Sequence, residues 1–96
     1  VYRAPVMGVG TETVLLVEDE PALRRTTSRL LQRAGYRVFA AQHGDDALLV
    51  WRERGGSRGE IAALVTDVRM PGLGGWELAR RLRAERQGLP VLIVSG

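Results

Sequence analysis

The sequence contains no cysteine, and this absence excludes several classes of function at once. A chain without cysteine has no disulfide framework, no thiolate metal site and no cysteine nucleophile. Long hydrophobic runs are missing too, because runs such as residues 14–17 and 91–94 are far shorter than the roughly 20 residues of a membrane-spanning helix. No basic segment followed by an apolar one opens the chain as a signal peptide would. We therefore expect a cytoplasmic domain that makes no contact with a membrane.

Lysine is also absent, so all 14 basic residues are arginines. These arginines are spread along the chain rather than gathered in one block, and for this reason the net charge of +3 does not predict direct binding to nucleic acid. With 96 residues, 45% of them hydrophobic and 26% charged, the chain has the size and the balance of one small folded domain. A two-domain enzyme is excluded.

Regular patterning begins only after residue 12. Residues 1–12 contain Pro5, Gly8 and Gly10 without a sustained period, which is typical of a linker or tail. From there, short apolar runs alternate with segments of helical periodicity up to residue 96. The pattern predicts strands at 13–17, 36–41, 61–66 and 91–95, and helices at 21–34, 45–54 and 76–85.

This alternation of strands and helices predicts an α/β fold, a doubly wound parallel sheet with right-handed crossovers and helices on both faces. The run of residues 13–17 is apolar almost throughout, as a strand covered on both faces requires. We expect Trp51 and Trp76 to pack inside the domain and His43 to be a turn residue. In such a sheet, ligands bind beyond the carboxyl ends of the strands.

Polar side chains stand at the ends of three of the predicted strands. Glu18 and Asp19 follow the first strand, Asp67 follows the third, and Ser95 closes the fourth. Three carboxylates at one edge of the sheet repel one another unless a cation is bound. Mg²⁺ suits an all-oxygen ligand set and keeps coordination positions free for phosphate oxygens. The pattern therefore predicts a Mg²⁺ site for phosphoryl transfer, with Glu18 and Asp19 as metal ligands.

Asp67 is the best candidate for the nucleophile of such a reaction. It directly follows a buried strand and enters a loop rich in proline and glycine, which can bring backbone groups close to a ligand. A carboxylate can accept a phosphoryl group when a metal and hydrogen-bond donors neutralise the charge on the phosphoryl oxygens. The Ser95 hydroxyl could then donate a hydrogen bond to the transferred group.

Three motifs in this order and spacing resemble the receiver domain of two-component response regulators: VLLVEDE at residues 14–20, TDVRMPG at 66–72 and VLIVSG at 91–96. The resemblance implies a flavodoxin-like sheet of strand order 2-1-3-4-5, and phosphorylation of Asp67 by a phosphohistidine. It implies Mg²⁺ as cofactor, held by Glu18, Asp19, Asp67 and the backbone carbonyl of Arg69, and a switch role for Ser95. The implied partner is a histidine kinase or a histidine phosphotransfer domain, in the same chain or in another.

The same resemblance brings two open questions. The family's fifth strand, with its lysine, and its last two helices have no counterpart here, so we expect the protein to continue beyond Gly96. The segment ETVLLVEDE at 12–20 further resembles receivers fused behind histidine kinases, so the parent chain could be a hybrid kinase. A dimer is a further assembly left open.

Three alternatives to phosphorylation remain at this point. The missing lysine keeps open a degenerate receiver that acts only as an interaction module. A flavodoxin-type cofactor binder shares the strand order, but the acidic run at residues 18–20 would repel a flavin phosphate. A metal-dependent hydrolase of phosphoesters would differ from a receiver by turning over many times.

Overall fold

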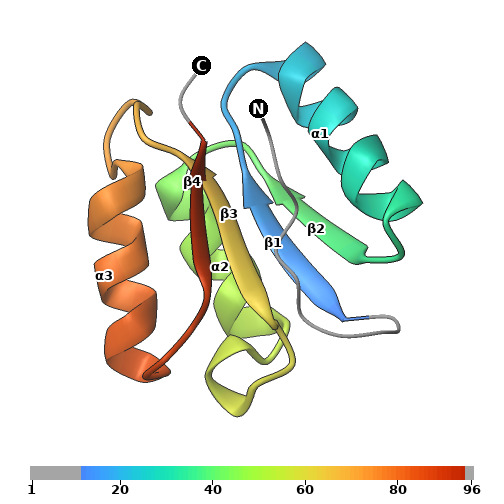
Figure 1. Ribbon diagram of the computed structural model, residues 1–96. Helices are drawn as coiled ribbons and strands as arrows, with labels where there is room; N and C mark the ends of the chain where they lie inside the picture. The colour runs from blue at the N-terminus through green and yellow to red at the C-terminus, as the bar shows by residue number, and fades with distance from the viewer. Residues whose placement is uncertain (1–11, 95–96) are drawn as a thin grey trace.

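The computed structural model describes residues 12–94, and the chain alternates strands and helices over this range as the sequence predicts. Figure 1 shows the order along the chain. The elements are β1 (Thr13–Val17), α1 (Pro21–Arg33), β2 (Arg37–Ala41), α2 (Gly44–Glu53), the short 3₁₀ turn η1 (Gly56–Arg58), β3 (Ala63–Asp67), α3 (Gly75–Glu85) and β4 (Val91–Val94).

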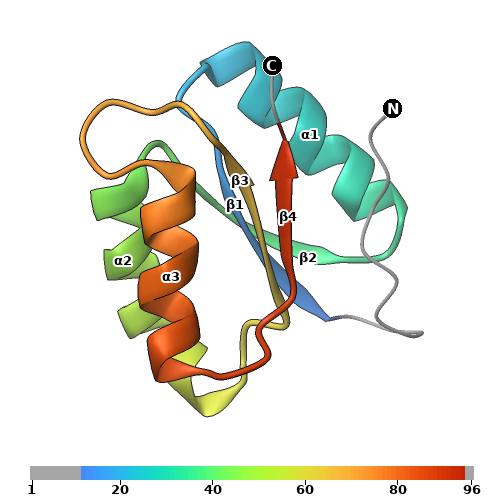
Figure 2. The same ribbon diagram turned by 60° about the vertical axis from the view of Figure 1, so that its left-hand side comes forward.

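The four described strands form one parallel sheet of order β2-β1-β3-β4. Figure 2 shows α1 on one face of this sheet and α2 with α3 on the other. Because each crossover returns the chain to the same edge, the carboxyl ends of all four strands point the same way. The predicted α/β fold and the strand order 2-1-3-4 are confirmed.

Both faces of the sheet carry apolar side chains, and β1 supplies them alternately. Leu15 and Val17 pack into the larger core, which lies between the sheet and the helices α2 and α3. Val14 and Leu16 pack into a smaller core with Leu31 of α1. Successive residues of a strand point to opposite faces, so a central strand covered on both sides needs a continuous apolar run. This requirement explains the sequence of β1.

The first residues of α1 and α2 are fixed by side chains that accept backbone N–H groups. The Glu20 carboxylate accepts from the N–H of Ala22 at 3.2 Å and from that of Leu23 at 2.7 Å, and Pro21 occupies the first helical position. His43 caps α2, because its Nδ1 accepts from the N–H of Asp46 at 3.3 Å. His43, expected to be a turn residue, is thus the N-cap of α2.

Several predicted boundaries shift by one or two residues. The second strand begins at Arg37, the second helix at Gly44, and the third strand at Ala63 rather than at Ile61. Ile61 is nevertheless fully buried, so its apolar character reports core packing and not strand pairing. None of the helices in residues 12–94 is long and apolar enough to cross a membrane.

The two tryptophans differ, and the prediction for Trp76 is wrong. Trp51 is 1% exposed, and its Nε1 donates to Oε1 of Glu85 at 3.0 Å, which joins α2 to α3. Trp76 is 66% exposed because it lies beside, and not on, the buried stripe of α3.

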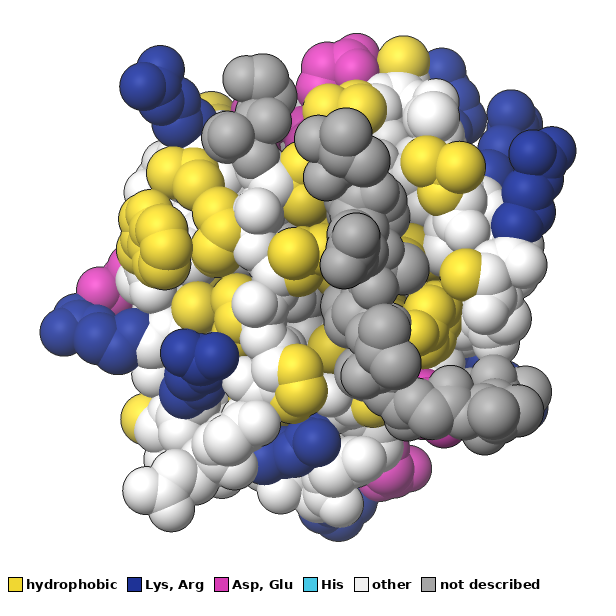
Figure 3. Space-filling view, viewed as in Figure 1, with side chains coloured by type: hydrophobic (Ala, Val, Ile, Leu, Met, Phe, Trp, Pro, Cys, Tyr) yellow, Lys and Arg dark blue, Asp and Glu magenta, His cyan; other side chains and the backbone are white. Residues whose placement is uncertain are grey.

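Figure 3 shows hydrophobic side chains gathered over α3 and β4, on the left of the view. A groove in this area is lined by Trp76, Ala79, Arg80, Arg83, Val91 and Ile93.

Candidate functional site

The carboxyl ends of β1 and β3 lie side by side, because Val17 pairs with Thr66 in the parallel register. The next residues along each strand are acidic. Glu18, Asp19 and Asp67 each offer one carboxylate oxygen, and these three oxygens lie within 4.8 Å of one another. The sequence-predicted cluster of these carboxylates therefore forms in the folded chain.

Glu18 is the buried member of the cluster, with 5% of its surface exposed. Its backbone N–H donates to the Ala41 carbonyl at 3.1 Å, and its Oε2 accepts from the N–H of Glu20 at 3.0 Å. Arg24, in the first turn of α1, donates from Nη1 to the Glu18 carbonyl at 2.8 Å. Neighbours on three elements thus hold the turn between β1 and α1, and with it the orientation of Glu18.

The electrostatics of the cluster disfavour three negative charges. Burial raises the pKa of the Glu18 carboxyl above its ordinary value, the Glu20 N–H opposes this rise, and the charges of Asp67 and Asp19 add to it. Within residues 12–94, no arginine forms an ion pair with any of the three carboxylates. The nearby Arg24 guanidinium donates to the backbone carbonyl of Glu18 and not to a carboxylate of the cluster.

Asp67 is the last residue of β3 and is half-buried. The N–H of Arg69 points at its Oδ1 from 3.4 Å, and the Thr66 hydroxyl donates to its backbone carbonyl at 3.0 Å. Asp67 directly precedes the loop of residues 68–74, which connects β3 to α3. Asp67 is therefore less buried than Glu18.

Gly75 was not recognised as part of the site from the sequence. A Cβ atom at this position would lie 2.2 Å from the backbone oxygen of Asp67, so only glycine lets α3 begin this close to the end of β3. Its N–H donates to the Val68 carbonyl at 3.1 Å. The pair Gly74-Gly75 before a helical run is the available signal in the sequence, but by composition alone it indicates only a loop.

The other two predicted site residues remain predictions. Arg69 is exposed, and its backbone lies next to Asp67, but the role of its carbonyl as a metal ligand is untested. Ser95 lies outside the described residues. The neighbouring Val94, the last residue of β4, pairs with Asp67 across the sheet.

The donor set fits Mg²⁺ by its chemistry. All three ligand atoms are carboxylate oxygens, which hard divalent cations prefer over nitrogen or sulfur. The gradient of burial from Glu18 to the exposed Asp19 leaves one side of the cluster open to solvent. An ion held there could bind protein oxygens on one side and keep its remaining positions for water or phosphate oxygens.

Comparison with known proteins assigns the chain to a family. Residues 14–96 match the response regulator receiver domain. The chain belongs to this family. It is 44% identical over 87 residues to the sensor kinase CckA of Brucella abortus, with 91% of this chain and 9% of the kinase covered. The chain therefore spans less than a tenth of that relative's length.

Solved receiver structures agree with the fold described above. The crystal structure of the receiver domain from the hybrid histidine kinase CckA matches with a TM-score of 0.74 at 36% identity, covering 88% of this chain and 75% of that one. The response regulator TrrA of Thermotoga maritima, solved in complex with Mg²⁺ and BeF, matches with a TM-score of 0.78 at 27% identity, covering 88% and 70%. The receiver assignment therefore rests on sequence and on fold.

Proposed function

We propose that Asp67 is the phosphoacceptor of this receiver domain and takes its phosphoryl group from a phosphohistidine. The observation that carries the proposal is the meeting of Glu18, Asp19 and Asp67 at one edge of the sheet, with Asp67 only partly buried. A receiver whose acidic cluster had lost a member, or whose aspartate was covered, would not support it.

In the proposed reaction an oxygen of the Asp67 carboxylate attacks the phosphorus atom in line with the P–N bond. The O–P bond forms as the P–N bond of the phosphohistidine breaks, and the leaving imidazole nitrogen keeps the electron pair and is protonated. The product is an acyl phosphate on Asp67.

Glu18, Asp19 and Asp67 would hold the Mg²⁺ ion, and the family resemblance adds the Arg69 carbonyl. When bound, the ion neutralises negative charge on the carboxylates and on the phosphoryl oxygens. The chain's own residues contribute orientation: the Glu20 N–H and the Arg24 guanidinium keep the turn that carries Glu18 in place. The Mg²⁺ and BeF complex of the similar regulator TrrA supports this assignment.

The phosphodonor in this proposal is a histidine kinase or a histidine phosphotransfer domain, encountered on the cytoplasmic side of the membrane. The likeness to the sensor kinase CckA makes a donor in the same chain as reasonable as one in another chain. The exposed arginines of α1, at positions 25, 29 and 33, lie on the element that follows the acidic turn, so a partner that reaches Asp67 meets them as well. The Ser95 hydroxyl would donate to the bound phosphoryl group.

The test is phosphorylation with a small donor. With Mg²⁺ and acetyl phosphate, the protein should gain the mass of one phosphoryl group, and Asp67→Asn should gain none. Asp45→Asn is the matched control, because Asp45 is an exposed aspartate in the first turn of α2. Equal labelling of Asp67→Asn would remove Asp67 from its role.

The stoichiometry separates the alternatives. Continued release of phosphate over many turnovers would indicate a hydrolase instead of a phosphoacceptor. Failure of the unaltered protein to label, together with undiminished binding to a histidine kinase, would indicate an interaction module that works without phosphorylation.

A further inference from the structure

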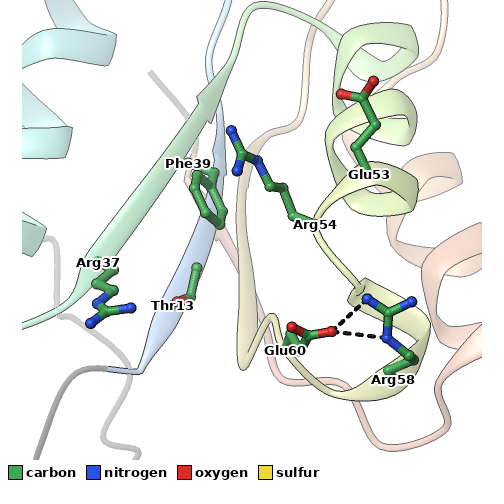
Figure 4. A pocket seen from close by; sticks show the side chains of 7 residues that line it. All are labelled: Thr13, Arg37, Phe39, Glu53, Arg54, Arg58 and Glu60. Carbon is green, nitrogen blue, oxygen red and sulfur yellow. Dashed lines mark hydrogen bonds and ion pairs between the residues drawn. The ribbon is translucent and has the colours of Figure 1, made fainter.

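A second polar pocket lies at the end of the sheet opposite to the acidic cluster. Thr13 and Arg37, the first residues of β1 and β2, form one wall of it, whereas the acidic residues follow the last residues of the strands. Phe39 continues this wall (Figure 4), and the opposite wall comes from the end of α2 and from the turn that follows it. The cavity has a volume of about 410 Å³, within the range of small-molecule sites.

Three arginines line this pocket, and they differ in what already engages them. Arg58 is paired with Glu60, from Nη2 at 2.7 Å and from Nε at 2.9 Å. The Arg54 guanidinium lies 4.7 Å from the centroid of the Phe39 ring. Arg37 has no acidic partner within residues 12–94. Among the described residues, the Arg37 guanidinium is therefore without an ion-pair partner and can bind an anion.

The acidic residues do not cancel this charge. Glu60 is engaged by Arg58. Figure 4 shows the Glu53 carboxylate on α2 pointing away from Arg37 and Glu60, at the far end of the pocket. The lining residues include three arginines and two glutamates, so the lining carries a net positive charge. Figure 4 shows Thr13 between Arg37 and Phe39.

We propose that this pocket binds a small phosphorylated molecule with a planar ring, that is, a ligand of the nucleotide class. Guanidinium groups bind phosphate oxygens in a bidentate way, and Arg37 with Thr13 provides donors for one phosphate. Phe39 and the Arg54 guanidinium above its ring would provide the surface for the planar part of the ligand, since planar guanidinium groups and aromatic rings both stack on planar rings. A phosphate without a ring, or a ring without a phosphate, uses only half of the pocket.

The pocket and the proposed phosphorylation site share no residues. None of the residues that line the pocket belongs to the acidic cluster. β1 nevertheless connects the two ends of the sheet, because it starts at Thr13 and leads directly into Glu18. A ligand in the pocket therefore contacts the strand that carries the acidic turn without blocking access to Asp67.

The experiment is a calorimetric titration of the full protein with AMP, with adenosine and with inorganic phosphate. AMP should bind, and adenosine and phosphate should each bind at least about tenfold more weakly, a difference that corresponds to one lost charged or stacking contact. Arg37→Gln should weaken AMP binding by a similar factor. Arg52→Gln is the matched control, since Arg52 is exposed on the last turn of α2 and does not line the pocket, so AMP should bind it as it binds the unaltered protein.

Two further arms make the result decisive. Asp67→Asn should bind AMP unchanged, so that failure of the phosphoacceptor proposal leaves this one standing. No AMP binding, AMP binding that Arg37→Gln leaves intact, or AMP binding that Arg52→Gln weakens as much as Arg37→Gln would overturn the proposal. Tight binding of a glutamate-rich peptide in place of AMP would also overturn it, and would indicate a protein partner at this pocket.

Discussion

The core beneath α2 and α3 differs from the acidic cluster at the carboxyl ends of the strands in how its buried groups are satisfied. In the core, apolar side chains fill the space, and the one polar atom of Trp51 has its partner in Glu85. In the cluster, a buried carboxylate lies beside two further carboxylates, and no arginine within residues 12–94 compensates them. The core therefore stabilises the fold, whereas mutual repulsion in the cluster destabilises the fold as long as no cation neutralises it.

The largest expected effect tests the core half of this comparison. Trp51→Ala removes a fully buried ring and its hydrogen bond to Glu85, and should lower the free energy of unfolding by about 3–5 kcal/mol. Trp76→Ala is the matched control, because Trp76 is largely exposed and should change stability by less than about 0.5 kcal/mol. Urea unfolding followed by circular dichroism measures both, and similar losses would contradict the assignment of the core.

A smaller effect is expected where the two regions meet. Gly75→Ala places a Cβ atom 2.2 Å from the Asp67 backbone oxygen and should cost about 1–3 kcal/mol of stability. It should also slow phosphorylation by acetyl phosphate, because Asp67 must move. Gly74→Ala is the control, since its Cβ atom would lie 3.3 Å from the nearest atom, the Val68 oxygen. If the two variants lose stability and labelling rate equally, the close approach at Gly75 is not what positions Asp67.

Removing a charge from the cluster should raise the free energy of unfolding, whereas damage to the core lowers it. Without divalent cations, Glu18→Gln should raise the free energy of unfolding by roughly 0.5–2 kcal/mol, because one of three neighbouring charges is removed. Adding Mg²⁺ should raise the melting temperature of the unaltered protein but not that of this variant. Glu53→Gln, an exposed glutamate outside the cluster, should respond to Mg²⁺ like the unaltered protein. Loss of stability in Glu18→Gln would refute the idea of a strained cluster.

Without Mg²⁺, the stability difference between the unaltered protein and Glu18→Gln should depend on pH. Because the pKa of Glu18 is raised on folding, the native state binds more protons than the unfolded state between the ordinary and the raised value. The unaltered protein should therefore lose stability relative to Glu18→Gln as the pH rises through this interval. Below the ordinary pKa the difference should vanish. The measurement is the melting temperature of both proteins in matched buffers. A difference between the two melting temperatures that does not change with pH would contradict the pKa shift.

The smallest effect concerns an exposed charge that is well paired. Hydrogen bonding to Arg80, and then to Arg81, lowers the pKa of Glu77 below its ordinary value. Its contribution to stability should therefore be present above the ordinary pKa and be lost as the pH falls through the lowered value. Glu77→Gln should lower the melting temperature slightly, and high salt should remove the difference. A salt-independent loss would indicate a packing role for the side chain.

The fold could be predicted because its signals are local and agree with one another. The apolar run of β1, the proline at the start of α1 and the aspartate at the end of β3 each indicate one element, and parallel connections then bring Glu18, Asp19 and Asp67 to one edge. The missed features depend on contacts between distant segments. Trp76 could equally have faced the core by composition, and the close approach at Gly75 exists only once α3 is set against β3.

The pocket near Arg37 and Arg54 could not be found from the sequence for the same reason. Arg37 lies far along the chain from Arg54 and Arg58, and only the packing of α2 against the sheet brings it close to them. The opposite holds for the acidic cluster, whose members follow strands that pair directly with each other. Residues placed by strand pairing are therefore more predictable than residues placed by helix packing.

The central claim is that Asp67 itself carries the phosphoryl group. After incubation with Mg²⁺ and acetyl phosphate, reduction with borohydride converts an acyl phosphate on an aspartate into homoserine, which peptide mass spectrometry locates. Homoserine is expected at position 67 alone, only in the presence of Mg²⁺, and in a smaller amount in Glu18→Gln. Homoserine at another aspartate, or none at position 67 in a protein that gains a phosphoryl group, would contradict it.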